Sequence, residues 1–165
     1  MISKKMTAAI NDQINKEMYS AYLYLSMSAY ASEQNLDGLA SWMKLQAQEE
    51  MGHAMKFYGY LQEQEAAVKL KAIDAPPTSF ASPVKIFQDS LAHEKKVTAS
   101  IHKLVDLARA EKDYASEIML QWFVTEQVEE EATAAGILAK LKQIGADPRG
   151  LYLIDRELGA RGAGH

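Results

Sequence analysis

The eight residues Gln46–His53, QAQEEMGH, place a carboxylate and an imidazole on the buried side of a predicted helix. Glu50 and His53 are three residues apart, so on a helix they lie on the same face, one turn from each other. Further helical steps in both directions give one stripe, which consists of Leu39, Met43, Gln46, Glu50, His53, Phe57 and Tyr60. A carboxylate in such an apolar stripe costs several kcal/mol unless a partner compensates its charge. The partner that compensates this charge therefore has to be found.

Three further segments show the same pattern, each with one acidic residue near the middle of an apolar stripe. The acids are Glu17, Glu94 and Glu130. The spacing predicts helices over about 3–32, 38–64, 83–112 and 114–144. The three additional stripes read Met6, Ile10, Ile14, Glu17, Ala21, Tyr24, Ser28, Ala31; Phe87, Ser90, Glu94, Val97, Ile101, Leu104, Ala108; and Leu120, Phe123, Gln127, Glu130, Ala134, Ile137, Leu141, Ile144.

Turn and capping residues separate these predicted helices. Asp37, in the short connection 35–38, fits the N-cap of the second helix. Ser82 fits the N-cap of the third helix, with Pro83 at its first position. Gly145 follows the fourth helix as its C′ residue. Because the first connection is short, we expect the first two helices to be antiparallel neighbours.

Residues 65–82 form the one long connection. Val68, Leu70 and Ala72 alternate with lysines in a brief strand-like pattern, and Pro76-Pro77 excludes a helix. An extended chain rises about 3.3 Å per residue, so this linker can cross the bundle from end to end. The third helix is then parallel to the second. After Asp147-Pro148, residues 149–158 are typical of one or two helical turns, followed by a frayed Gly-rich tail.

These features predict an all-α fold, namely a four-helix bundle over about 3–144 with one long crossover connection. A short fifth, C-terminal helix is expected over about 148–158. At 165 residues the chain is expected to form a single domain, 1–165, with a sizeable core. Its hydrophobic fraction of 48% and charged fraction of 24% are ordinary for a soluble globular protein.

Charge and composition exclude several classes of function. The formal net charge of −4 gives no basic footprint, so no nucleic-acid partner is expected. No run approaches the roughly 20 apolar residues of a membrane span, and the N-terminus lacks the apolar segment of a signal peptide. We therefore expect a cytoplasmic protein without a membrane partner. The absence of cysteine excludes disulfides, thiolate zinc sites and thiol catalysis.

The four mid-stripe acids predict a metal site. If all were ionised, a charge of −4 would lie in the core, and no stripe contains a Lys or Arg to offset it. Two divalent cations would balance that charge. Carboxylates with one imidazole suit Fe, Mn or Zn better than copper, while magnesium favours more water and calcium favours loop oxygens. The alternative is a metal-free bundle whose four carboxylates lie at the edges of the stripes.

The same residues resemble the ferritin-like di-iron bundles, in which two helices each supply a Glu and two supply Glu-x-x-His. Glu17 and Glu94 match the single acids, and Glu50-Met51-Gly52-His53 matches the first Glu-x-x-His. The second motif departs, because Gln127-Val128-Glu129-Glu130 stands in its place. In this departure the chain resembles the bacterial non-haem ferritins, and the resemblance covers essentially the whole chain. Bacterioferritins keep a histidine at the position of Glu130.

The resemblance implies a ferroxidase centre with named ligands. Glu17, Glu50 and His53 would hold one iron. Glu50 would bridge to a second iron held by Glu94 and Glu130, with Gln127 close by. A third iron site would use Glu49, Glu126 and Glu129, shared with Glu130; the alternative for Glu126 and Glu129 is a solvated acidic face. Tyr24 and Trp122 match aromatic residues beside the centre, where either an electron-donating role or a purely structural core role is open.

The function implied by the resemblance is iron storage. Fe(II) would be oxidised to Fe(III) by O₂ or H₂O₂ at the di-iron centre and stored as a ferric mineral inside a hollow shell. The shell would be a homo-oligomer of twenty-four subunits. Carboxylates stabilise Fe(III) over Fe(II), which supplies driving force, and two neighbouring irons meet O₂ with two electrons at once.

Three alternatives stay open. A haem-containing, bacterioferritin-like protein would use Met51, but Glu130 in place of histidine favours the non-haem reading, so no haem is expected. A rubrerythrin-like di-iron peroxidase usually carries a cysteine-ligated iron module, which a chain without cysteine lacks. The third alternative is the metal-free bundle. The other histidines, His93, His102 and His165, are expected to be exposed.

Overall fold

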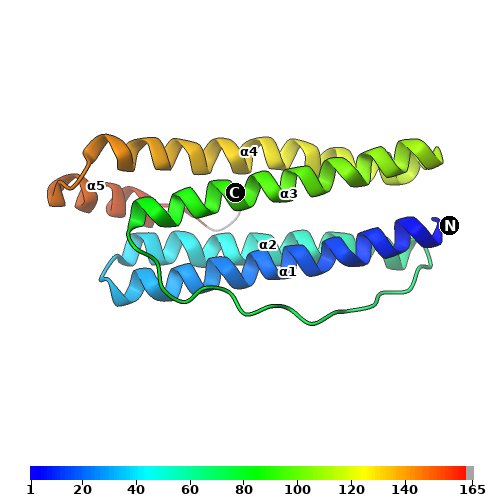
Figure 1. The fold of residues 1–165 in the computed structure, drawn as a ribbon, viewed down its shortest axis with the longest axis horizontal. Helices are drawn as coiled ribbons and strands as arrows, with labels where there is room; N and C mark the ends of the chain where they lie inside the picture. Colours follow the sequence, from blue (N-terminus) through cyan, green and yellow to red (C-terminus); the bar gives the residue numbers. More distant parts are fainter. Residues whose placement is uncertain (163–165) are drawn as a thin grey trace.

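The computed structural model describes residues 1–162, which form five α-helices (Figure 1). These are α1 (Lys4–Glu33), α2 (Asp37–Glu63), α3 (Pro83–Glu111), α4 (Tyr114–Ile144) and α5 (Pro148–Gly159). No β-strand occurs within this described range. The predicted all-α class is confirmed, and the predicted boundaries of the four long helices lie close to the observed ones. None of the described helices combines the length and the apolar character needed to cross a bilayer.

The four long helices form two antiparallel pairs, α1 with α2 and α3 with α4 (Figure 1). The connection between α2 and α3 runs along the outside of α1, from one end of the bundle to the other. As predicted, α3 is therefore parallel to α2. Ser82 caps the N-terminus of α3 by accepting from the backbone N–H of Lys85, with Pro83 beginning the helix. Gly145 ends α4 with a positive φ of 57°.

The connection 64–82 contains no strand, so the prediction of a strand-like patch at Val68, Leu70 and Ala72 is wrong. The backbone of this connection forms hydrogen bonds with side chains of α1 instead of with a neighbouring strand. Asn11 donates to the carbonyl of Ala67 (2.9 Å) and accepts from the N–H of Lys69 (2.6 Å). Because these bonds come from a helix, they satisfy the backbone of the connection at separate points rather than as a ladder.

The core consists of two hydrophobic clusters with a polar band between them. One cluster centres on Met27, Met43 and Phe87, and the other on Ile10, Phe57 and Ile101. The predicted stripe residues are buried, except that Ile137 and Ile144 are only half-buried. The four mid-stripe acids lie in this polar band, between the two clusters in the middle of the bundle.

α5 packs against α2 and α4 and is longer than the one or two turns predicted, at 12 residues. Its Asp155 carboxylate accepts from the backbone N–H groups of Gly38 (3.2 Å) and Leu39 (2.8 Å). The prediction that Asp37 is the N-cap of α2 is therefore wrong: Leu36 holds that position without a side-chain bond, and Asp155 does the capping. A Cβ at position 38 would lie 1.7 Å from the Asp155 carbonyl oxygen, so this approach requires glycine.

Candidate metal centre

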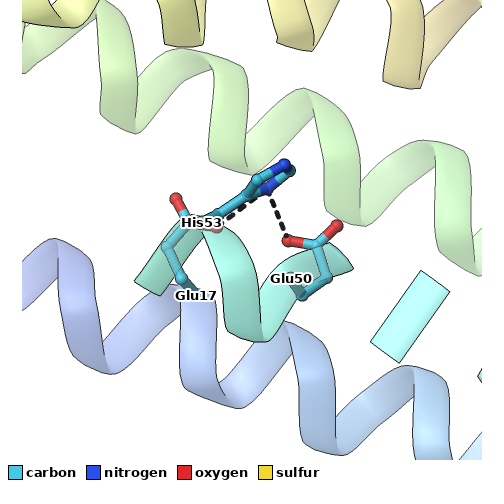
Figure 2. A group of neighbouring side chains, drawn as sticks. All are labelled: Glu17, Glu50 and His53. Atoms are coloured by element: carbon cyan, nitrogen blue, oxygen red, sulfur yellow. Dashed lines mark ion pairs between the residues drawn. The ribbon is translucent and has the colours of Figure 1, made fainter. Parts of the chain in front are cut away.

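Glu17 of α1 and Glu50 and His53 of α2 meet in the middle of the bundle (Figure 2). Nδ1 of His53 lies 3.3 Å from Oε2 of Glu50 and 4.0 Å from Oε2 of Glu17. One ligand atom from each residue lies within 4.8 Å of the other two. The structure thus brings together the three residues that the resemblance assigns to a first iron.

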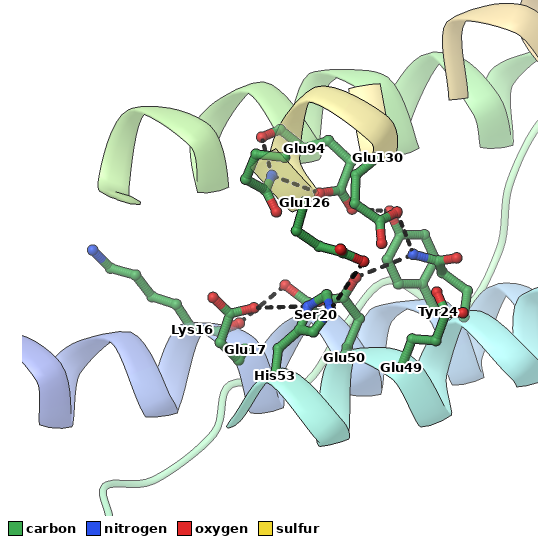
Figure 3. Close-up of polar contacts among 12 residues, drawn as sticks. Lys16, Glu17, Ser20, Tyr24, Glu49, Glu50, His53, Glu94, Glu126 and Glu130 are labelled. Atoms are coloured by element: carbon green, nitrogen blue, oxygen red, sulfur yellow. Dashed lines mark hydrogen bonds and ion pairs between the residues drawn. The ribbon is translucent and has the colours of Figure 1, made fainter. Parts of the chain in front are cut away.

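A second group connects α2 with the other helix pair. Glu50, Glu94 of α3 and Glu130 of α4 each place a carboxylate oxygen within 4.8 Å of the other two. Glu50 belongs to both groups, so its carboxylate has the position of a bridging ligand. Figure 3 shows the acids from the four long helices converging on one region. Glu50, Glu94 and Glu130 are the residues predicted for the second iron.

The four carboxyl groups are buried, and burial raises their pKa values. Burial, followed by the charge of Glu50, raises the pKa of Glu17 to about 8. Burial, followed by the charge of Glu94, raises the pKa of Glu130 to about 8. The pKa values of Glu50 and Glu94 are also raised, mainly by burial. Without a bound cation the centre therefore carries protons at neutral pH, and a cation that binds there displaces them.

Two buried glutamines hold the second group in place. Nε2 of Gln46 donates to Oε2 of Glu130 (2.7 Å) and to Oε1 of Glu50 (3.2 Å). Nε2 of Gln127 donates to Oε2 of Glu94 (3.1 Å), so Gln127 borders the centre and contacts it through this carboxylate. Gln46 belongs to the predicted stripe of α2, although sequence reasoning assigned it no role.

Gln13, which lies outside the predicted stripes, holds the first group. Its side chain is buried and donates from Nε2 to Oε1 of Glu17 (2.7 Å). Ser100 donates to Oε1 of Gln13 (2.6 Å) and accepts from Nζ of Lys16 (2.7 Å). A hydrogen-bonded chain therefore runs from the surface of the bundle to a predicted ligand. The signal in the sequence is the spacing of Gln13 and Glu17, one helical turn apart.

Tyr24 and Trp122 have different surroundings. The hydroxyl of the buried Tyr24 donates to Oε1 of Glu94, and burial together with this carboxylate raises the pKa of Tyr24 well above its usual value. Tyr24 therefore stays protonated beside the second group. Trp122 is 40% exposed, with its ring 5.5 Å from that of His53 and Nζ of Lys56 3.8 Å above it. The core reading of Trp122 is wrong, because the ring covers His53 from a position open to solvent.

One oxygen at the first group lacks a partner. Oε2 of Glu17 accepts no hydrogen bond from any of the described residues, although its side chain is only 1% exposed. Buried polar atoms in proteins nearly always have a partner. In the metal-free subunit, a proton shared between Glu17 and Glu50 would satisfy this oxygen. A cation between Glu17, Glu50 and His53 would take the place of that proton. The donor set and this oxygen both fit a pair of divalent cations.

The three acids predicted for a third site do not form one compact group. Oε1 of Glu126 lies 3.7 Å from Nε2 of His53, and Glu126 forms a further group of ligand atoms with His53 and Glu130 (Figure 3). Glu49 and the exposed Glu129 instead line, together with Glu126, a cavity of about 420 Å³ beside the centre. Metal-bound histidines commonly direct their second nitrogen at a carboxylate, so Glu126 also fits the role of orienting His53.

Arg161, two residues beyond α5, lies in the same cavity and was missed by sequence reasoning. Its Nη2 is 2.8 Å from Oε2 of Glu49, and its Nη1 donates to Oε1 of Gln46 (2.9 Å). The expectation that no protein cation lies near the buried acids is therefore wrong at this edge of the centre. A separation of 115 residues between Gln46 and Arg161 gave the sequence pattern no way to connect them.

The remaining histidines differ from the prediction in part. His93 is half-buried rather than exposed: its Nε2 lies 2.7 Å from Oγ of Ser20, and burial lowers its pKa to about 4. It lies beside the rings of Tyr19 and Tyr24. His102 is exposed, as predicted. His165 lies outside the described residues.

Comparison with known proteins agrees with this arrangement. A family model described as the ferritin-like domain matches residues 7–144, which span the four-helix bundle. The chain belongs to the ferritin family. A bacterial non-heme ferritin of Bacteroides fragilis is 47% identical over 161 residues, which cover 98% of this chain and all of that protein. A bacterial non-heme ferritin of Staphylococcus aureus is 40% identical, covering 98% of this chain and 97% of the relative.

Solved ferritin structures match the whole bundle and α5. An open pore ferritin from the hyperthermophilic archaeon Archaeoglobus fulgidus superposes with a TM-score of 0.98 at 49% identity, covering 98% of this chain and all of that one. A humanized archaeal ferritin gives a TM-score of 0.99 at 46% identity over the full length of both chains. The predicted ferritin-like fold, with its long crossover and fifth helix, is confirmed for this ferritin.

Proposed function

We propose that this ferritin stores iron and that each subunit oxidises Fe(II) to Fe(III) with O₂ or H₂O₂ at an internal di-iron centre. The observation that carries the proposal is the place of Glu50 in both groups of ligand atoms. Two ions that share one carboxylate are close enough to give their electrons to a single oxidant. The ferric product then moves into a hollow shell, where it is stored as a mineral.

The proposed ligands divide between two ions. Glu17, Glu50 and His53 hold the first iron, and Glu50, Glu94 and Glu130 hold the second, with Gln127 orienting Glu94. The carboxylate-rich second site favours Fe(III) over Fe(II), because anionic oxygen stabilises the higher charge. Glu49, Glu126 and Glu129 form the proposed third site, on the path from the centre to the cavity that these three residues line.

The proposed oxidation balances without a further reactant. Each of two Fe(II) ions gives one electron, O₂ takes both electrons with two protons, and the products are two Fe(III) ions and H₂O₂. When H₂O₂ is the oxidant, two electrons and two protons break its O–O bond and give two waters. The buried carboxyl groups release protons as Fe(II) binds. Tyr24, hydrogen-bonded to Glu94, is placed to donate one further electron, which together with one electron from an Fe(II) ion at the third site and two protons would reduce that H₂O₂ to two waters.

We propose that the subunits form a hollow homo-oligomeric shell of twenty-four copies in the cytoplasm, without nucleic-acid or membrane partners. The full-length similarity to solved ferritins supports such an assembly. Large apolar side chains also lie open on the isolated subunit, for example Leu25, Ile118 and Leu153, and contacts between copies would cover such side chains.

A haem-containing storage protein is the less favoured alternative. The relatives of high identity are named non-heme ferritins, and Glu130 contributes its carboxylate to the second group. Met51, the residue matched to a haem ligand, is 41% exposed on the isolated subunit. We expect no Soret band in the absorption spectrum of the purified protein; a Soret band that remains through purification of the assembled shell would favour the haem alternative.

Aerobic loading with Fe(II) tests the storage proposal. Purified metal-free protein is given Fe(II) in excess of its binding sites, ferric absorbance is followed, and the product is sized by analytical ultracentrifugation. We expect iron to sediment with a large protein shell that is denser than the metal-free form. Iron that precipitates apart from the protein, as it does in buffer alone, would overturn the proposal.

A further inference from the structure

The guanidinium of Arg161 is largely buried and held by several partners. Its side chain is 11% exposed, and that of Glu49, its ion-pair partner, is 23% exposed. The guanidinium carbon lies 4.6 Å from the centre of the Trp42 ring, and Nη1 also contacts the Trp42 carbonyl at 3.4 Å. An arginine held by an aromatic face, an amide oxygen and a carboxylate is restricted to one position.

Arg161 is linked to the centre through Gln46. Nη1 of Arg161 is a donor, and Oε1 is the only acceptor of the Gln46 amide, so the bond between them directs Nε2 of that amide toward Glu50 and Glu130. Gln46 therefore has the positive charge on one side and the two carboxylates on the other. A change at Arg161 reaches the di-iron centre through one side chain.

The arginine also shares a carboxylate with the cavity. Glu49 lines the cavity together with Glu126, Glu129 and Glu130, and its Oε2 is the atom that Arg161 contacts. A metal ion bound by Glu49 would meet the guanidinium at the same oxygen. Two cations that compete for one carboxylate repel each other, so only one of them binds there strongly.

α5 positions Arg161. Asp155 of α5 caps the N-terminus of α2, and Arg161 follows the end of α5 by two residues. The cap and the arginine thus attach the C-terminal segment to both ends of the first half of α2, at Gly38 and at Glu49. The arginine is therefore held by the fold rather than by a loose tail.

We propose that Arg161 acts as an internal competitor of iron at Glu49, and so controls how long iron stays between the di-iron centre and the cavity. The inference rests on the proposed function, because it takes the cavity acids to be the third iron site. In the iron-free subunit the guanidinium occupies Glu49. An iron ion that leaves the centre displaces it, and the returning guanidinium then releases that iron toward the cavity.

Zn²⁺ binding to the assembled, metal-free protein tests this inference without any redox activity. Isothermal titration of the wild type is expected to resolve a tight class of about two ions per subunit and a weaker class. Arg161→Gln removes the competing charge and should tighten the weak class about tenfold or more. The matched control is Arg156→Gln, which removes an exposed positive charge from α5 itself and should change neither class.

A double variant assigns the gain to Glu49. Arg161→Gln combined with Glu49→Gln should lose the added affinity, because the carboxylate that the arginine releases is no longer present. If Arg161→Gln leaves the weak class unchanged or weakens it while the tight class is intact, the inference is overturned. Absence of the tight class from the wild type would instead count against the proposed di-iron centre, so the two failures are distinguishable.

Trp42 gives a direct readout of displacement. In a Trp122→Phe background, Trp42 is the remaining tryptophan, because the chain has two. Filling of the weak class should change Trp42 emission when Arg161 is present, since the guanidinium leaves the ring. The change should be absent from Arg161→Gln. An equal change in both proteins would show that zinc does not move the arginine, and would overturn the inference.

Discussion

Oε2 of Glu17 lies 4.0 Å from Nδ1 of His53, and no hydrogen-bond donor within residues 1–162 reaches this oxygen. The separation is too long for a hydrogen bond. It equals roughly two metal–ligand bonds of about 2.0–2.2 Å placed end to end. The relationship therefore fits a cation between the two side chains, which would satisfy the one oxygen of this buried carboxylate that no donor of the described residues reaches.

The free energy of unfolding of the metal-free protein should fall as the pH rises from 6.5 to 8. The pKa values of Glu17 and Glu130 are raised to about 8, so the native state holds protons that the unfolded state has lost. Stability falls with rising pH wherever the native state binds more protons. His93 has the opposite effect, but only between its lowered pKa of about 4 and its unfolded value of 6.5. Denaturant unfolding across this window measures the slope.

Glu17→Gln keeps the shape of the side chain and removes its titration, so it should flatten that slope. The matched control Glu33→Gln changes an exposed acid at the end of the same helix and should leave the slope as in the wild type. A slope that persists in full when both Glu17 and Glu130 are replaced by Gln would contradict the assignment of these protons to the centre.

The two iron sites should fill unequally. The first has the imidazole of His53, whereas the second has carboxylates alone, and nitrogen ligation favours Fe(II). Crystals soaked anaerobically with less than one Fe(II) per subunit should show the higher anomalous peak beside His53. Equal peaks at this loading would mean that the imidazole does not set the order of filling.

Gly38→Ala should detach α5. The new Cβ would lie 1.7 Å from the carbonyl oxygen of Asp155, which is backbone and moves only with its helix. Overpacking of this kind costs about 1–3 kcal/mol, and the cap on α2 would be lost as well. Gly59→Ala is the matched control, since nothing lies within 4 Å of its added Cβ; it should stabilise α2 by roughly 0.5–1 kcal/mol. Chemical denaturation compares the two, and equal stability would refute the close approach.

The cavity acids should affect later turnovers rather than the first. Glu49→Gln with Glu129→Gln leaves the two principal groups of ligand atoms intact, so the first rapid oxidation should be unchanged. The ratio of Fe(II) consumed to O₂ consumed, measured with an oxygen electrode, should change, because without the third iron O₂ receives two electrons and ends as H₂O₂, whereas a third Fe(II) together with Tyr24 would supply the two further electrons that reduce it to water. A ratio and repeat turnover identical to the wild type would reduce these residues to an acidic surface.

Helical periodicity predicted the bundle and its ligands because it determines which side of a helix is buried. Glu17, Glu50, Glu94 and Glu130 each interrupt an apolar stripe, and a stripe can be recognised without knowledge of its neighbours. Which acids share one ion depends on how the helices pack, and that assignment came from the family resemblance rather than from spacing. The structure places them in groups that agree with it.

Apart from the bonds of Gln13 to Glu17 and of Gln46 to Glu50, each one helical turn apart, the contacts that sequence reasoning missed join distant parts of the chain. Asp155 caps α2 across 116 residues, so the local preference of Asp37 for an N-cap was overridden by a better-placed acceptor. Arg161 reaches Gln46 from a Gly-rich tail that has no periodicity of its own. The alternation at Val68 suggested a strand, but α1 offers that backbone single side-chain partners and no strand edge.

Rapid-mixing measurement of Fe(II) oxidation tests the di-iron centre most directly. Metal-free protein is loaded anaerobically with increasing Fe(II) and mixed with O₂, with Glu50→Gln and the exposed control Glu63→Gln measured in parallel. We predict a fast phase that saturates at two Fe(II) per subunit, is unchanged in Glu63→Gln, and is lost in Glu50→Gln because both ions share that carboxylate. A fast phase that does not saturate at two, or that survives in Glu50→Gln, would contradict the account.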